Sequence, residues 1–452
     1  MIHTIFGSKI LRLAAAAPLA ALSLLLLTAF PANAMKIQKV TSKKGIEAWL
    51  VEDHSRPILS MQFAFTGGAT QDPDGKPGVA HFVSGMLDEG SGDLDSEAFQ
   101  KRLEDLAAKF NVNASHDHMT VTFQTLTENR AESIKLLQMA IASPHFGPAD
   151  VERIREQIVA NLRQEEKDPN KAASNEWFKV AFGPHAYGRP VNGTLASIAA
   201  VTPADLHDYV EKNFARDNLK VAVVGDIDAA QLGETLDFVF GGLPEKAVLT
   251  PVREVAWEKA SKQRVLQMPN PQSVVHFGFE GLKRADPDFI PAYILNYVVG
   301  GGGFSSKLMQ EVREKRGLAY SVYTYLFPLD HAGIFMGGVA TENKSVGKSM
   351  ELIRTELERV ADEGLSEKEL RTAKDYLIGS FALRFDTSAK IAQQLLAIQL
   401  DDLGMDYIDR RNGEIEAITV DDIKRVAKRL MGPKNLIVTV AGAPEGIQDA
   451  GL

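Results

Sequence analysis

The sequence predicts an α+β protein of two homologous domains, each an antiparallel sheet with helices packed on one face. The first observation is an internal repeat, because residues 201–225 and 418–442 align without a gap. The second is a weaker likeness between residues 146–162 and 365–381, at nearly the same offset. The third is the order of the patterns, since alternating strands come first and amphipathic helices are grouped after them.

Each copy of the repeat contains the same local signals. A threonine followed three residues later by an aspartate is typical of a capping box at the start of a helix. A turn and an apolar strand ending at glycine come next. The matched positions are Thr202, Asp205 and Gly225 in the first copy, and Thr419, Asp422 and Gly442 in the second. We therefore expect each domain to contain this helix and strand.

The remaining elements of the first domain follow from periodicity. Strands are expected at residues 46–52, 58–66 and 118–126, and helices at residues 131–143 and 150–166. The predicted domains are 35–242 and 264–452, joined by a linker at 243–263 that contains Pro244 and Pro251.

The first 34 residues are expected to be a cleaved signal peptide. Lys9 and Arg12 precede an apolar stretch from Leu19 to Phe30, and Ala32-Asn33-Ala34 supplies a cleavage site. An N-terminal membrane anchor is the alternative. Removal of this segment and its two positive charges leaves 452 − 34 = 418 residues with a net charge of −9 − 2 = −11. We expect a periplasmic protein with no later membrane span.

Composition limits the chemistry of the chain. There are 50 Lys and Arg against 59 Asp and Glu, an acidic balance that argues against nucleic-acid binding. No cysteine is present, which excludes disulfides, thiolate metal sites and a cysteine nucleophile. Any metal must be held by carboxylates and by some of the ten histidines.

The segment Gly78–Gly92, GVAHFVSGMLDEGSG, carries the most chemistry. It resembles the signature of the insulinase/pitrilysin-like zinc peptidases, the inverted zincins, whose motif H-x-x-E-H supplies two zinc ligands and a general base. His81 matches the first ligand, but Ser84 stands at the base position and Gly85 at the second histidine. The resemblance places the third ligand at Glu152.

A catalytic zinc ion needs three protein ligands, so His81 and Glu152 are expected to be vestigial and no metal is expected in this chain. The hydrolytic machinery is interpreted as broken. Two alternatives remain open for His81: a partly buried histidine without a metal, or a weak site completed elsewhere. His116 and His118 are candidates for that completion, because positions i and i+2 on a strand share a face.

Residues 300–321, GGGGFSSKLMQEVREKRGLAYS, resemble the second-domain signature of the same family closely. The resemblance implies that Arg313 and Tyr320 reach an active site and hydrogen-bond the substrate carbonyl, as oxyanion stabilisers do. Gly317 would permit the turn between helix and strand. The alternative is that Arg313 is one charge on a solvated helix and Tyr320 anchors a strand.

Two further segments are candidates for substrate binding. The glycine run lacks the Lys-Ser/Thr of a phosphate-binding loop and is interpreted as a flexible loop at which Gly301 and Gly302 allow a peptide to approach. Asn113 and Ala114 precede the strand that contains His118. In the family this edge strand pairs with an extended substrate, and the alternative is an ordinary turn.

The resemblance covers essentially the whole mature chain. It implies a peptidase subunit without its own zinc centre or other cofactor, which pairs with a zinc-bearing paralogue and supplies Arg313 and Tyr320. The substrates would be extended peptides, and the zinc would lie in the partner chain. Two alternatives remain: a self-sufficient zinc metallopeptidase with unusual ligands, and a non-enzymatic peptide-binding or scaffold subunit.

Overall fold

The computed structural model describes residues 35–432 and 435–450, so the predicted signal peptide lies outside the described residues. The contacts discussed below lie within the unit that begins at Lys39. Among the described helices, none is both long enough and apolar enough to cross a membrane.

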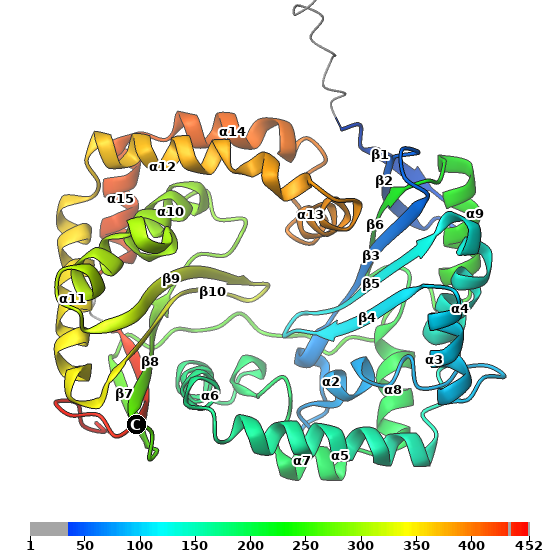
Figure 1. Cartoon of the computed structure of the whole chain (residues 1–452), viewed down its shortest axis with the longest axis horizontal. Coiled ribbons are helices and arrows are strands. Elements are labelled where there is room, and N and C mark those ends of the chain that lie inside the picture. Colours follow the sequence, from blue (N-terminus) through cyan, green and yellow to red (C-terminus); the bar gives the residue numbers. More distant parts are fainter. Residues whose placement is uncertain (1–34, 433–434, 451–452) are drawn as a thin grey trace, which may run out of the picture. The chain divides into compact units, whose positions relative to one another are not determined.

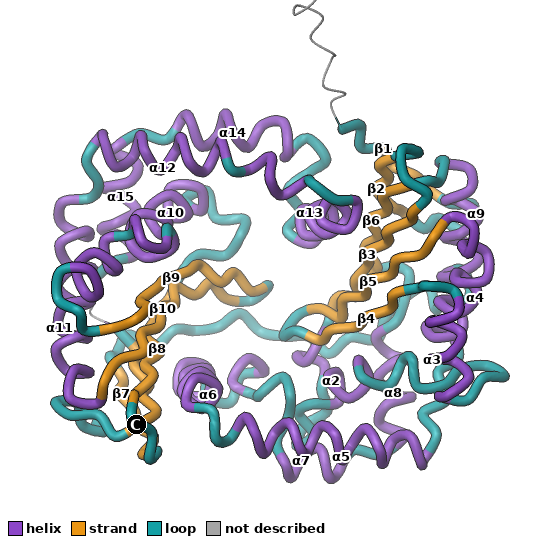
Figure 2. The backbone as a smooth tube through the Cα atoms, viewed as in Figure 1, coloured by secondary structure: helices purple, strands orange, loops and turns teal. Residues whose placement is uncertain are grey.

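Two sheets organise the described residues (Figures 1 and 2). The strands are β1 Gln38–Thr41, β2 Glu47–Glu52, β3 Ile58–Thr66, β4 Lys109–Ala114, β5 His118–Leu126, β6 Leu219–Gly225, β7 Lys262–Gln267, β8 Gln272–Glu280, β9 Ala319–Leu329, β10 Ala332–Glu342 and β11 Ile437–Gly442. The first sheet has the order β1-β2-β6-β3-β5-β4 and the second the order β7-β11-β8-β10-β9. Apart from β1, the two orders are the same, as a duplicated unit would give.

The α+β class with two related domains is confirmed, but each sheet contains one parallel pair. Strand β6 lies parallel to β2, and β11 lies parallel to β7, whereas the other strand pairs with a recorded register are antiparallel. In each half the last strand returns after a series of helices: β6 inserts between β2 and β3, and β11 inserts between β7 and β8. Such a long crossover permits a parallel neighbour, which a hairpin does not.

Helices fill the connections between the strands. They are α2 Val79–Ser84, α3 Ser96–Asp105, α4 Arg130–Ala142, α5 Pro148–Glu165, α6 Pro169–Phe182, α7 Leu195–Ala200, α8 Pro203–Asn213, α9 Ala229–Phe240, α10 Phe289–Asn296, α11 Val346–Glu363, α12 Glu367–Gly379, α13 Ser388–Leu400, α14 Tyr407–Ala417 and α15 Val420–Leu430. The segment between α9 and β7, where the linker is predicted, contains no helix or strand.

The predicted repeat has the same local structure in both halves. Capping boxes start α8 at Thr202 and α15 at Thr419. Strands β6 and β11 end at Gly225 and Gly442, whose φ angles are 137° and 152°. A Cβ at Gly225 would lie 2.1 Å from the carbonyl oxygen of Ile58, so only glycine fits this strand end.

One face of each sheet packs against helices of its own half. On β3, for example, Met61, Phe63 and Phe65 belong to a buried cluster that also contains side chains of α2, α4, α5, α8 and α9. The opposite positions Ser60 and Gln62 are buried as well, although they are polar. A second layer must therefore cover the other face, which the sequence analysis did not anticipate.

That second layer is an exchange of single helices between the halves. Helix α6 of the first half packs on β8 and β11, and α13 of the second half packs on β3 and β6. Trp177 of α6 is fully buried and its indole nitrogen donates to the carbonyl oxygen of Ile437 at 3.2 Å. In return, the side-chain amide of Gln399 in α13 donates to the carbonyl oxygen of Val221 at 3.0 Å.

Replacement of Trp177 by alanine tests the importance of this exchange. We expect Trp177→Ala to lower the free energy of unfolding by about 3–5 kcal/mol, because a large cavity would remain between α6 and the second sheet. Chemical denaturation followed by far-UV circular dichroism measures the change. Lys171→Ala, at an exposed position of the same helix, serves as the control and should stay within about 0.5 kcal/mol of the wild type. A Trp177→Ala loss as small as that of the control would contradict the proposed role.

Candidate functional site

Helix α2 carries the degenerate metal motif and is held by a buried carboxylate. The two oxygens of Asp72 accept hydrogen bonds from the backbone nitrogens of Gly78 and Ala80, both at 2.7 Å. Burial raises the pKa of Asp72 to about 7. His81 lies one turn into the helix, where burial lowers the pKa of its imidazole. His81 is therefore a mostly neutral side chain near pH 7.

The positions around His81 do not provide a zinc site. The Ser84 hydroxyl donates to the carbonyl oxygen of His81 at 2.7 Å, and Gly85 ends the helix. A Cβ at Gly85 would lie 3.6 Å from Cγ2 of Ile154, so a buried isoleucine faces the place of the second histidine. Glu152 is exposed instead, and its carboxylate pairs with Arg155 at 3.0 Å.

His81 and Glu152, the two candidate ligands, therefore do not form a common site: Glu152 is exposed and pairs with Arg155. On an α-helix, residues two positions apart point in different directions, so a buried Ile154 places Glu152 on the solvent side. Within the described residues, no group of three or more His, Asp and Glu side chains is arranged to hold a metal ion. The donor set around His81 therefore does not fit zinc.

The expectation that His116 and His118 share a strand face is wrong. Strand β5 begins at His118, and His116 lies in the turn that precedes it. The His116 ring stacks on Phe178 with ring centres 5.0 Å apart, and Nε2 of His118 lies 3.8 Å from a carboxylate oxygen of Asp330. Burial lowers the pKa of His116 to about 4.

Arg313 and Tyr320 lie together, as the family resemblance implies. Arg313 is on a π-helical turn, Met309–Glu314, and Tyr320 is near the start of β9. Gly317 joins them with a φ of 61°, and its nitrogen donates to the carbonyl oxygen of Arg313 at 2.7 Å. The guanidinium carbon of Arg313 lies 5.0 Å from the centre of the Tyr320 ring.

A second aromatic ring completes the contact. The guanidinium carbon of Arg313 is 4.5 Å from the centre of Phe304, so the cation lies between two aromatic rings. Phe304 is 67% exposed and Tyr320 is 80% exposed. Phe304 is not among the residues predicted from the sequence. Its position directly after the glycine run could have drawn attention to it. A single exposed aromatic residue, however, does not by itself predict a contact with Arg313.

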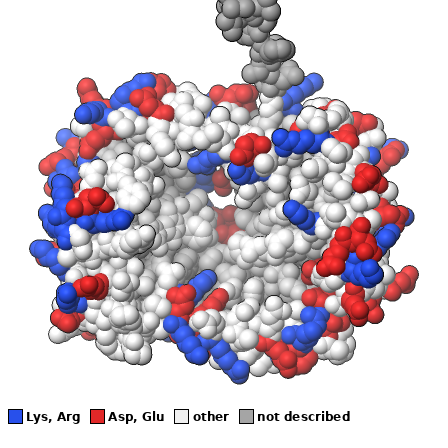
Figure 3. Space-filling model, viewed as in Figure 1, with Lys and Arg blue, Asp and Glu red and all other residues white. Residues whose placement is uncertain are grey.

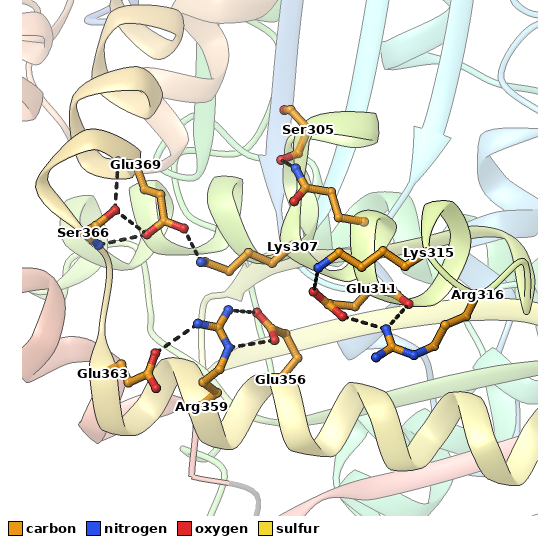
Figure 4. A network of polar contacts seen from close by, with 11 residues as sticks. Ser305, Lys307, Glu311, Lys315, Arg316, Glu356, Arg359, Glu363, Ser366 and Glu369 are labelled. Atoms are coloured by element: carbon orange, nitrogen blue, oxygen red, sulfur yellow. Dashed lines mark hydrogen bonds and ion pairs between the residues drawn. The ribbon is translucent and has the colours of Figure 1, made fainter.

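The other charges of this segment have carboxylate or cationic partners (Figure 4). Lys307 pairs with Glu369, and Glu311 pairs with Lys315 at 2.5 Å and with Arg316 at 2.6 Å. For Arg313 the structure records one longer approach, 3.7 Å between its Nε and Glu314. Arg313 therefore differs from its neighbours on the solvated face, because aromatic rings rather than a close carboxylate position its guanidinium.

The glycine run is helical rather than an open loop. A π-helical turn, Tyr297–Gly301, continues α10, and a short 3₁₀ turn follows at Gly303–Ser305. A Cβ at Gly300 would lie 2.6 Å from the backbone nitrogen of Thr324, so this glycine allows close packing against β9. For Gly301 and Gly302, an added Cβ would meet Asn296 and Tyr297 of the same half. The close approach that these glycines allow is therefore within the chain itself.

Asn113 and Ala114 form the end of β4, the outermost strand of the first sheet. Asn113 is exposed and Ala114 is buried. Strand β4 pairs with β5 on one side, which leaves its other edge available to an extended peptide. The structure therefore places both residues on an edge strand, and the alternative of a simple turn is excluded.

Charge on the surface is mixed in sign. In Figure 3, acidic and basic side chains alternate around the rim of the viewed face, and its middle is mostly uncharged. This distribution gives the face no single sign with which to attract a polyanion.

Two profiles of one family match the chain. The first, described as insulinase (peptidase family M16), matches residues 48–195, and the second, described as peptidase M16 inactive domain, matches residues 200–377. A Helicobacter pylori protein named non-peptidase homolog YmxG is 29% identical over 358 residues, which cover 79% of this chain and 82% of the relative. An uncharacterized zinc protease of Streptomyces coelicolor is 25% identical over 372 residues, which cover 81% of each chain.

Solved structures are similar over the same length. A peptidase M16 inactive domain from Pseudomonas fluorescens has a TM-score of 0.85 and 29% identity, covering 92% of this chain and all of that chain. A protease from Helicobacter pylori, at 19% identity, shares the fold with a TM-score of 0.83 and covers 90% of this chain and 99% of that chain. The duplicated sheets, the degenerate motif on α2 and the Arg313–Tyr320 segment agree with these matches, and the chain therefore belongs to the insulinase family, peptidase family M16.

Proposed function

We propose that this chain is a subunit without its own zinc centre, which pairs with a zinc-bearing paralogue and completes that partner's active site. The observation that carries the proposal is the state of Arg313 and Tyr320. A guanidinium held between Phe304 and Tyr320 by cation–π contacts, without a close carboxylate, keeps its N–H donors available for another acceptor. The Tyr320 ring is largely exposed beside it.

The chemistry supplied by this pair is stabilisation of negative charge. A carbonyl oxygen that becomes an oxyanion during peptide cleavage accepts hydrogen bonds from donors placed in advance, which lowers the barrier. Arg313 would donate from its guanidinium and Tyr320 from its hydroxyl. Neither group acts as a nucleophile or a general base, so the pair alone would not cleave a peptide.

The missing functions would come from the partner chain. Zinc does not fit the donors of this chain, because Gly85 stands at the second ligand position, the apolar Ile154 rather than Glu152 faces it, and Ser84 cannot act as a base near neutral pH. Extended peptides would add to the free edge of β4 at Asn113. A relative named non-peptidase homolog and the inactive-domain profile over residues 200–377 support the same reading. The pairing would take place in the periplasm after export.

The role of Arg313 can be tested in the complex. A tagged form of this chain is recovered with its partner from the native cell, and cleavage of an internally quenched peptide is followed. Arg313→Ala and Tyr320→Phe should each lower kcat about 100-fold, because each removes one donor to the oxyanion. Arg316→Ala is the matched control, since Arg316 lies in the same segment but pairs with Glu311. Unchanged kcat in Arg313→Ala, or full activity of the partner alone, would refute the proposal.

Zinc content gives an independent test. After dialysis against zinc and gel filtration, the wild-type chain should retain no stoichiometric metal, and Ser84→Glu/Gly85→His should not retain it either. Addition of Ile154→Glu should give one zinc ion per chain, because it places a third ligand opposite position 85. Glu152→Gln in this triple variant is the control and should leave the zinc content unchanged. Zinc binding by the double variant that Glu152→Gln abolishes would show Glu152 to be the ligand.

A further inference from the structure

A cavity of about 290 Å³ lies beside the turn that follows β4. Its lining includes His116 from that turn, Phe178 and Lys171 from α6, Glu165 from the end of α5, and Tyr325 and Phe327 from β9. Neither the degenerate metal motif on α2 nor the Arg313 segment contributes a residue to this lining.

One wall of the cavity consists of aromatic rings. The rings of His116 and Phe178 are stacked, with centres 5.0 Å apart and planes 14° apart. Phe327 meets Phe178 edge-on at 6.2 Å, and Tyr325 meets Phe327 edge-on at 6.3 Å. The centres of the four rings are thus spaced as in favourable aromatic pairs, and they present ring faces and edges to whatever enters.

The rest of the lining includes polar side chains, and its charged groups already have partners. Glu165 accepts a hydrogen bond from the side-chain amide of Asn192 at 2.9 Å and lies 4.0 Å from the Lys171 ammonium. Arg189, which also lines the cavity, donates to the carbonyl oxygens of Thr70 and Asp72, both at 3.1 Å, and its guanidinium lies 3.5 Å from the Asp74 carboxylate. His116 is neutral near pH 7, because burial lowers its pKa to about 4.

The balance of these charges disfavours a basic guest. Lys171 has Glu165 as a carboxylate neighbour and Arg189 has Asp74, so neither a basic nor an acidic side chain would find a free charge of opposite sign. An acidic guest would be placed against the neutral aromatic wall. An uncharged ring fits this lining, because it can stack on the aromatic rings and leaves the two ion pairs intact.

The position of the cavity connects it to the peptide path. His116 is two residues beyond Ala114, where the edge strand β4 ends. Tyr325 and Phe327 belong to β9, the edge strand of the second sheet, which begins beside Tyr320. The cavity is therefore lined by the continuation of one proposed peptide-binding strand and by the strand that carries Tyr320.

We propose that this cavity is a specificity pocket that binds the aromatic side chain of an extended peptide. The inference rests on the proposed function for the peptide ligand, and it adds the class of peptide: one with Phe or Tyr at a single position. A pocket of about 290 Å³ has room for one such ring. The ring would replace water on the faces of Phe178, Tyr325 and Phe327.

Binding of peptides to this chain alone tests the proposal. A set of peptides identical except for Phe, Tyr, Ala or Lys at one position is labelled and titrated with the wild-type protein, with fluorescence anisotropy as the readout. The Phe and Tyr peptides should bind at least about tenfold more tightly than the Ala and Lys peptides. Equal affinities for all four peptides would overturn the proposal.

A variant that fills the cavity locates the preference. Ser174→Phe puts a ring into the cavity from α6, and Lys179→Phe puts the same residue at an exposed position of the same helix. Ser174→Phe should abolish the preference and leave the affinity for the Ala peptide unchanged, whereas Lys179→Phe should behave as wild type. If Ser174→Phe unfolds the chain, as judged by circular dichroism, Phe327→Ala replaces it and should reduce the preference by enlarging the cavity. A preference that survives both variants would place the ring elsewhere.

Two further arms separate this proposal from others. N-acetylphenylalanine amide should compete only weakly with the Phe peptide, and competition as strong as that of the unlabelled peptide would show a small-molecule site instead. Arg316→Ala, which changes a charge paired with Glu311 outside this lining, should keep the preference for aromatic residues, and the assay contains no partner and no cleavage. The aromatic preference is measured on this chain alone, and the pairing with a zinc-bearing partner is measured by cleavage in the complex. Either proposal can therefore fail while the other holds.

Discussion

The structure depends on the exchange of α6 and α13 between the two halves. Each sheet packs one face on its own helices and would leave the other face in water, although side chains such as Ser60 and Gln62 on β3 are buried there. Helix α6 covers β8 and β11, and α13 covers β3 and β6. Gly278 makes the first contact possible, since a Cβ at this position would lie 2.8 Å from the Trp177 ring. Each half therefore contributes a helix to the core of the other half, and the two halves stabilise each other.

This exchange also positions the residues that concern function. Adjacent side chains of α6 have different roles: Trp177 is buried against the second sheet, and Phe178 stacks on His116 at the cavity. Strand β9 is likewise shared, because it pairs with β10 in the second sheet and carries Tyr320 at its start and Phe327 near its end. The packing of Gly300 against Thr324 fixes the glycine turn, and with it Phe304, next to Arg313. The arrangement of Arg313 is thus supported by the core of the second half.

Local signals in the sequence predicted the fold class, the repeated elements and the Arg313–Tyr320 segment. They did not predict the long-range packing between the two halves. The capping boxes at Thr202 and Thr419 depend on residues within one helical turn, so the repeat located them correctly. The family resemblance of the segment that contains Arg313 and Tyr320 indicated that these two side chains act together. The exchange of helices depends on contacts between α6 and β11, which are far apart in sequence, and no periodicity encodes it. His116 was misplaced because the strand alternation was extended two residues before the start of β5. Glu152 was misplaced because the helix position was matched to the family motif without knowing which face of α5 is buried.

The side chains near His81 are compatible with burial in the absence of a metal ion. A buried carboxylate without a cation is expensive, since its charge must be stripped of water with no partner in return. Ile154 carries no such cost, because it places a buried apolar side chain opposite Gly85, which itself needs no partner. His81 can remain because a neutral imidazole tolerates burial, which lowers its pKa. Burial costs Arg313 less, because it is only partly buried, and two aromatic rings contact its guanidinium without a close carboxylate. The contacts that hold Arg313 beside Tyr320 therefore do not depend on zinc ligands in the same chain.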